Sequence, residues 1–200
     1  YEDPFLAARL VLKGGTALNL CFGEVPRLSV DLDFNDIGAP DRDLAIEERQ
    51  TVMAAMERIA RRRGYRVQRS AFAHAGQKLY LGYGSALGGD RRVEVDVNFL
   101  FRLPLDPVEN CTAWSPQGDP PVVCRVVGRA ELVAGKLLAL LDRTAPRDLY
   151  DVAHLPERRS RRIGDRPLPL GRVPGRRQLR RLHRRKLCPQ RPALRSERER

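Results

Sequence analysis

Two aspartates separated by a single residue, Asp31 and Asp33, place the strongest constraint on the fold of this chain. They belong to segment 28–34, which is predicted to be a β-strand, and side chains two residues apart on a strand point to the same face. A third aspartate, Asp96, lies inside the apolar run 93–100, where an acid must be paired, exposed or functional. Carboxylates on neighbouring strands supply the oxygen ligands that hard divalent cations prefer. The sequence therefore predicts a sheet that carries an acidic metal site.

A pair of glycines, Gly14 and Gly15, lies upstream of the aspartates. Because glycine has no Cβ, the backbone N–H groups there can approach a phosphate closely. Residues 16–21 are predicted to form a short helix whose first turn presents N–H groups to an anion. Transfer of a nucleotide requires cations that neutralise the phosphate charge. Glycines and carboxylates together indicate metal-assisted nucleotide transfer, although an Asp-x-Asp pair alone is more often a solvated turn.

The net charge of +12 is distributed unevenly along the chain. Residues 1–157 contain 20 Lys and Arg against 22 Asp and Glu, a net charge of −2, whereas residues 158–200 contain 17 against 3, a net charge of +14. The second segment has no aromatic residue and no sustained apolar period, so it cannot build a hydrophobic core. We therefore expect residues 158–200 to form a disordered basic tail.

Two explanations fit this tail. A basic arm binds RNA or DNA by neutralising phosphates, which gives affinity without sequence specificity. The composition also changes abruptly near Glu157, and sequence rich in Arg, Pro and Gly without aromatics is what a GC-rich gene yields when translated out of frame. We favour the frameshift, which the nucleotide sequence would decide.

Residues 1–157 show a mixed pattern of helices and strands. Apolar spacing and capping residues predict helices at 16–21, 41–63, 131–142 and 147–155. Apolar or alternating segments predict strands at 28–34, 65–71, 78–83, 92–101 and 122–127. The glycine-rich segment 84–90 suits a hairpin turn, and the proline-rich segment 104–121 is expected to be a loop.

Cysteine spacing and hydropathy indicate the compartment. The four cysteines, Cys21, Cys111, Cys124 and Cys188, include no C-x-x-C pair, so we expect reduced thiols and no structural zinc. No segment approaches the 18 consecutive apolar residues that would cross a bilayer, and no signal peptide is visible. We expect a cytoplasmic protein without a membrane partner.

Three separated segments resemble one known family. They are VLKGGTALNL at 11–20, RLSVDLDF at 27–34, and ELVAGKLLALL at 131–141 followed by RTAPRDLYD at 143–151. In this order they resemble the AbiEii-type toxin nucleotidyltransferases, the toxins of type IV abortive-infection toxin–antitoxin pairs. The resemblance covers about residues 5–156, and three segments in the family's order are far more specific than any one of them.

The resemblance implies an α+β fold of the DNA polymerase β-like nucleotidyltransferase type. Residues 1–127 would form the nucleotidyltransferase core, and residues 128–157 a short helical portion. Members of the family normally continue as a helical domain, and here the basic tail 158–200 follows instead, which puts stable folding and activity of this chain in question.

The resemblance also implies the residues of the site. Gly14 and Gly15, with Thr16 beside them, would lie at the phosphates of the nucleotide. Asp31 and Asp33 would hold magnesium. Asp96 is similar to the third carboxylate of such folds, which helps to deprotonate or orient the attacking hydroxyl.

Two further charged residues belong to the predicted site. Lys136 lies in an otherwise apolar helix, so it must reach solvent or contact an anion, and a triphosphate is the natural anion. Asp148 and Asp151, three residues apart on one helical face, orient Lys136 or Arg143 by ion pairing, or only cap and solvate their helix. The resemblance favours a site role for Lys136 and Asp148.

A run of arginines allows two interpretations. Arg61–Arg63, with Arg58, Arg66 and Arg69 nearby, is more often a solvated helix end favoured by the helix dipole. It is also a place where an RNA backbone could lie.

The sequence thus favours a magnesium-dependent nucleotidyltransferase toxin that transfers a nucleotide from an NTP to an acceptor. The resemblance suggests that the acceptor is the 3′ end of tRNA and that a cognate antitoxin is the protein partner. Two alternatives stay open: a small-molecule nucleotidyltransferase, and an inactive nucleic-acid-binding remnant.

Overall fold

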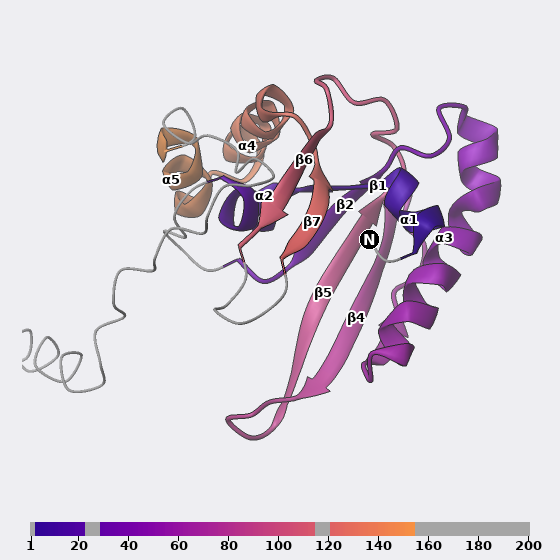
Figure 1. Cartoon of the computed structure of the whole chain (residues 1–200). Coiled ribbons are helices and arrows are strands. Elements are labelled where there is room, and N and C mark those ends of the chain that lie inside the picture. Colours follow the sequence, from indigo (N-terminus) through magenta and orange to yellow (C-terminus); the bar gives the residue numbers. More distant parts are fainter. Residues whose placement is uncertain (1–2, 23–28, 115–120, 155–200) are drawn as a thin grey trace, which may run out of the picture. The chain divides into compact units, whose positions relative to one another are not determined.

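The computed structural model of the chain describes residues 3–22, 29–114 and 121–154. These residues form one seven-stranded mixed sheet with helices packed against it (Figure 1). The helices are α1 (Pro4–Arg9), α2 (Gly14–Cys21), α3 (Arg42–Arg62), α4 (Arg129–Arg143) and α5 (Pro146–His154). The strands are β1 (Leu10–Lys13), β2 (Leu32–Asp36), β3 (Arg66–Arg69), β4 (Gly76–Gly84), β5 (Asp90–Asn98), β6 (Glu109–Ala113) and β7 (Val122–Val126). The prediction of a mixed fold of helices and strands is confirmed.

The order of strands in the sheet is β3-β4-β5-β2-β1-β7-β6. The β2–β5 and β1–β7 pairs are parallel, and the other four pairs are antiparallel. The predicted hairpin turn joins β4 to β5, where Gly88 and Gly89 adopt positive φ. Strands β2 and β5, which carry the predicted acidic residues, are therefore direct neighbours in the middle of the sheet.

Local signals position most elements, and three elements were missed. The long helix α3 begins where Asp41 accepts hydrogen bonds from the backbone N–H groups of Asp43 and Leu44. Helix α1 and strand β1 were not predicted, and the expected loop 104–121 contains strand β6. The prolines on either side of β6 favoured the prediction of a loop. The strand forms because it pairs with β7 and buries Cys111 and Ala113, and not because of its own β-propensity.

Two hydrophobic clusters hold the sheet and helices together. One lies among β1, β7, β6, α2 and the start of α4, and includes the fully buried Val11, Phe22 and Val126. The other lies between α3 and strands β4 and β5. Leu32 and Phe34 of β2 pack against both clusters, so the central strand joins them.

The cysteines differ from the prediction. Cys21 of α2 and Cys111 of β6 form a disulfide with a Cα–Cα distance of 5.8 Å, and the thiol of Cys124 lies 3.6 Å from Cys21 Sγ. Burial raises the pKa of the Cys124 thiol to about 11, so this thiol stays protonated. The expectation of reduced thiols for Cys21 and Cys111 was wrong, because packing of α2 on β6 joins residues that are 90 positions apart in the sequence.

The predicted boundary at 127 stays a prediction. The boundary at 157 and the predicted tail lie outside the described residues. None of the helices in the described part is long and apolar enough to span a membrane.

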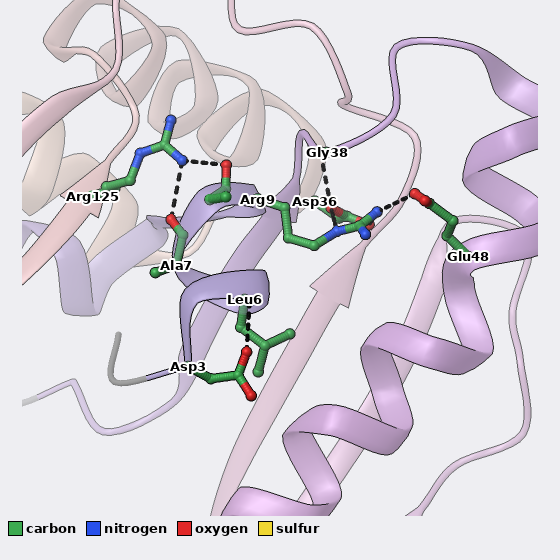
Figure 2. Close-up of polar contacts among 9 residues, drawn as sticks. Asp3, Leu6, Ala7, Arg9, Asp36, Gly38, Glu48 and Arg125 are labelled. Atoms are coloured by element: carbon green, nitrogen blue, oxygen red, sulfur yellow. Dashed lines mark hydrogen bonds and ion pairs between the residues drawn. The ribbon is translucent and has the colours of Figure 1, made fainter.

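A buried arginine links α1, β2 and α3. Arg9 Nε donates to Asp36 Oδ1 at 2.9 Å, and Arg9 Nη2 donates to Asp36 Oδ2 at 3.1 Å and to Glu48 Oε2 at 2.6 Å (Figure 2). The side chains of Arg9 and Asp36 are 5% and 2% exposed, whereas Glu48 is 34% exposed. Asp36 therefore depends on Arg9 for its charge balance, because water cannot replace the guanidinium.

We expect Arg9→Met to lower the free energy of unfolding by about 3–5 kcal/mol, because it leaves the Asp36 carboxylate buried without a cation. The double variant R9M/D36N removes both charges and should recover part of that loss. Urea denaturation of the three proteins measures both effects. A double variant less stable than R9M alone would show that the Asp36 charge is not the cause.

Candidate active site

Side chains alternate between the two faces of the sheet along β2 and β5, and this places two carboxylates side by side on one face. Strand β2 pairs in parallel with β5, and Asp33 lies directly opposite Asp96. Adjacent strands are about 4.8 Å apart, and directly opposed side chains lie on the same face of a sheet. Asp31 precedes β2 and is exposed at the same cleft. The structure thus brings all three predicted carboxylates to one place.

These carboxylates lie in a cleft of about 600 Å³ between the sheet and α4, a size typical of small-molecule sites. Strands and the start of α2 form one wall, and α4 with the start of α5 forms the other. The charged and polar residues that line the cleft are Lys13, Ser29, Asp31, Asp33, Asn35, Lys78, Glu94, Asp96, Glu131, Lys136, Arg143 and Arg147.

The glycine pair lies against the carboxylates at the start of α2. Gly14 has a φ of +73°, and a Cβ there would overlap the Asp33 carboxylate, so only glycine fits both the backbone and the space. Lys13 is the N-cap residue and makes no side-chain capping bond, so the first-turn N–H groups are not capped by it. Gly14 and Gly15 both line the cleft, beside a helix end that favours anions.

Thr16 has a different position from the one expected. Its side chain is buried, and its hydroxyl donates a hydrogen bond to the backbone carbonyl of Asp31. This bond ties the glycine motif to the aspartate motif. Contact between Thr16 and a nucleotide stays a prediction, while a positioning role follows from the bond itself.

Opposite charges surround the carboxylates. Burial, together with the negative charges of Asp96 and Asp31, raises the pKa of Asp33, and the nearby Lys13 opposes this shift. Burial in turn lowers the pKa of Lys13. Lys78 Nζ lies 3.6 Å from Asp96 Oδ2 and also pairs with Glu94. The site concentrates negative charge that the lysines balance only in part.

The donor set fits a hard divalent cation. Asp33, Asp96 and Asp31 offer carboxylate oxygens, and Asn35 offers an amide oxygen. Asn35 is 3% exposed, lines the same cleft, and no described residue donates a hydrogen bond to its Oδ1. Within the described ranges, only the cysteine cluster brings three ligand atoms all within 4.8 Å of one another, so the oxygens of the three carboxylates do not all lie that close together.

A buried charge cluster forms the wall of the cleft that α4 and α5 provide. Lys136 Nζ lies 2.9 Å from Asp151 Oδ2 and 3.4 Å from Asp148 Oδ1, and all three residues are buried. Arg143 donates to both oxygens of Asp148, at 2.7 and 2.8 Å. Of the two interpretations of Asp148 and Asp151, ion pairing is the one observed. Lys136 is held at the cleft, and its contact with a triphosphate stays a prediction.

Sequence comparison identifies the family. The model of the nucleotidyl transferase AbiEii toxin family, type IV toxin–antitoxin system, matches residues 1–172. The chain belongs to this family. The matched range extends beyond residue 156, where we expected the resemblance to end. No curated protein matches the chain significantly.

Two solved structures resemble this AbiEii-family chain. MenT4, a nucleotidyltransferase toxin from Mycobacterium tuberculosis, is 30% identical with a TM-score of 0.52, and the match covers 76% of this chain and 51% of MenT4. JHP933 from Helicobacter pylori is 19% identical with a TM-score of 0.52, covering 76% of this chain and 60% of that one, and this likeness concerns the fold alone. The chain thus spans about half to three fifths of the length of these two proteins.

Sequence reasoning missed several cleft residues of this family member, among them Asn35, Lys78 and Glu94. Asn35 follows Asp33 by two positions, so period-2 alternation was a signal for it. Glu94 precedes Asp96 by two positions on the same strand, so the same alternation was a signal for it. Lys78 reaches the site because β4 pairs with β5, with Lys78 opposite Asp96. The hairpin turn predicted at 84–90 was the signal for that pairing.

We expect Asp148→Asn to lower the free energy of unfolding by about 3 kcal/mol at pH 7, because buried Lys136 would keep only Asp151 as its counter-charge. Hydrogen bonds from Arg143 hold the pKa of Asp148 at about 2, below its usual 3.8. The ionised carboxylate therefore stabilises the fold above about pH 4, and this contribution is lost as the pH falls through about 2.

The difference in stability between wild type and D148N should accordingly shrink as the pH is lowered from 5 towards 2. Urea denaturation across this range measures it, and Asp142→Asn, which removes an exposed charge nearby, serves as the control. A difference that stayed constant with pH would contradict this origin of the stability.

Proposed function

We propose that this chain is a magnesium-dependent nucleotidyltransferase toxin with a DNA polymerase β-like fold. It transfers a nucleotide from an NTP to an RNA acceptor, the 3′ end of tRNA, in the cytoplasm, and a cognate antitoxin is its protein partner. Family membership supports the class of activity. The observation that carries the proposal is the direct pairing of Asp33 with Asp96 in a cleft that begins at Gly14 and Gly15.

The site residues have distinct roles in this proposal. Asp31, Asp33 and Asp96 hold the cation, with Asn35 supplying a further oxygen. Magnesium, when bound, neutralises charge on the phosphates and favours the ionised form of the attacking hydroxyl. The backbone N–H groups at Gly14 and Gly15 bind phosphate oxygens at the positive end of α2.

The remaining residues position the substrates. Lys136 faces the triphosphate from α4, and Asp148 holds Lys136 and Arg143 in place by the ion pairs described above. Asp96 orients the acceptor hydroxyl and accepts its proton as the oxygen attacks the α-phosphate in line with the leaving pyrophosphate. Transfer is therefore achieved mainly by positioning and by balancing charge.

A labelling experiment tests the proposal. The full chain is incubated with magnesium, each α-labelled NTP in turn, and total bacterial tRNA. Label in the RNA fraction supports the proposal, whereas label in a small molecule indicates a small-molecule nucleotidyltransferase. Salt-sensitive tRNA binding without any transfer indicates an inactive remnant.

We expect Asp33→Asn and Asp96→Asn each to lower transfer by more than about a hundredfold, since loss of groups that only support metal ligands already costs 10- to 100-fold. Each substitution removes charge at nearly constant volume, so the thermal unfolding midpoint should change little. Asp43→Asn, at a side chain that is 83% exposed on α3, is the matched control. Near-normal turnover by either site variant would remove that residue from the metal site.

Gly14→Ala should lower transfer by more than about tenfold, because its Cβ overlaps the Asp33 carboxylate and the positive φ costs about 1–2 kcal/mol. Gly64→Ala separates these effects, since Gly64 has a φ of +86° but nothing within 4 Å of its added Cβ. Gly64→Ala should lose stability and keep its activity per folded molecule. Equal loss of activity in both variants would mean that backbone strain alone accounts for the effect.

A further inference from the structure

A second hollow lies on the same face of the sheet as the carboxylates. Three strands contribute to it in register, with Gly82 of β4 opposite Arg66 on one side and Arg92 on the other. The residues that line the hollow are Arg66, Gln68, Tyr80, Gly82, Asp90, Arg91 and Arg92. Because Gly82 has no side chain, the Arg66 side chain lies over this position, with Arg66 Nε 3.5 Å from where a Cβ would stand.

This hollow lies beside the cleft, along the same strands β4 and β5. On β4, Lys78 lines the cleft and Tyr80, two residues further, lines the hollow. On β5, Glu94 lines the cleft and Arg92 lines the hollow. Residues two apart on a strand share a face, so Arg92 lies about 13 Å along β5 from Asp96. A chain-like ligand can therefore occupy both places at once.

The arginines of the hollow are available to a ligand. Arg66 Nη2 pairs with Asp90 Oδ1 at 2.8 Å, but the two side chains are 66% and 70% exposed, and such exposed pairs are weak. The Arg92 guanidinium lies 4.9 Å from the centre of the Tyr80 ring, which orients it without neutralising its charge.

Arg58 and Arg61 of α3 and Arg69 of β3 also form ion pairs. Arg61 and Arg69 share the carboxylate of Glu57, with nitrogen–oxygen distances of 2.7 and 2.5 Å. Arg58 pairs with Asp3 at 3.3 Å. Of the arginines at 58–69, Arg66 alone lines the hollow, so it is the one that lies in line with the cleft.

We propose that Arg66 and Arg92 bind the phosphodiester backbone of the acceptor RNA and direct its end into the cleft. The inference rests on the proposed function, because it assigns the acceptor a surface beside the nucleotide site. Arginines neutralise successive phosphates without reading bases, and an aromatic ring and guanidinium planes offer stacking surfaces to unpaired bases. Arg66 and Arg92 lie on either side of Gly82, along the strands that lead to the cleft, so they can bind successive phosphates of one RNA strand.

The first test measures binding of labelled total bacterial tRNA to the full chain without NTP or magnesium. R66Q/R92Q should weaken binding by at least about tenfold, and should lower the slope of log affinity against log salt by about 1.4–1.8 for two lost phosphate contacts. R42Q/R58Q removes the same charge from exposed side chains of α3 and should change neither quantity comparably. Equal weakening in both double variants would overturn the proposal.

The second test leaves both arginines in place. A Cβ at Gly82 would lie 3.5 Å from Arg66 Nε, an ordinary contact, so the backbone accepts a side chain there and Gly82→Asp adds a negative charge beside Arg66. Gly82→Asp should weaken tRNA binding about tenfold, while Gly82→Ala, the control without charge, should bind nearly as wild type does. Equal tRNA affinity of G82D and wild type would overturn the proposal.

Transfer assays separate this inference from the proposed function. In R66Q/R92Q, KM for tRNA should rise at least about tenfold while KM for NTP stays unchanged. An unchanged KM for tRNA would overturn the proposal that Arg66 and Arg92 bind the acceptor, and it would leave the proposed function intact. A wild-type chain that binds tRNA through these arginines but transfers no nucleotide to it overturns the proposed function instead.

Discussion

Alternation of side chains along β2 and β5 is the constraint on which the rest of the structure depends. Leu32, Phe34, Val95 and Val97 pack into the hydrophobic clusters, and this burial leaves the intervening residues of both strands on the opposite face. A slip of one residue in either strand would bury carboxylates and expose the core, so packing specifies the register strongly. The interactions that stabilise the sheet therefore also assemble the site.

The two faces of the sheet consequently have separate tasks. Helix α3 covers the apolar face of β4 and β5, and a buried Arg9–Asp36 pair joins α3 to β2 through Glu48 (Figures 1 and 2). The polar face carries the carboxylates and, further along the same strands, the arginines of the second hollow. Carboxylates and arginines thus follow one another along one surface. This arrangement suits a ligand whose one end reacts beside a metal cation and whose remaining length carries negative charges that arginines bind.

The charge cluster of α4 and α5 shows why the predicted helical segment matters to the cleft. Burying Lys136 in an apolar helix is costly unless acids accompany it, and Asp148 and Asp151 meet that need from the next helix. The spacing of the two acids indicated ion pairing as one of two interpretations. The turn at Thr144, with its φ of 48°, reverses the chain and lets α5 deliver both acids to Lys136.

The sequence by itself determined the elements with strong local patterns, the acidic and glycine motifs, and the family. It did so because alternation, capping and motif spacing are local properties of the chain. Apart from the β4–β5 hairpin, which the glycine-rich turn predicted, only the tertiary structure decided which strands are neighbours. The pairing of β2 with β5 placed Asp96 opposite Asp33, and the packing of α2 on β6 joined Cys21 to Cys111. Pairing with β7 made a strand of 109–113 despite the prolines on either side of it. Contacts between distant segments follow from the packing of whole elements, which no local pattern encodes.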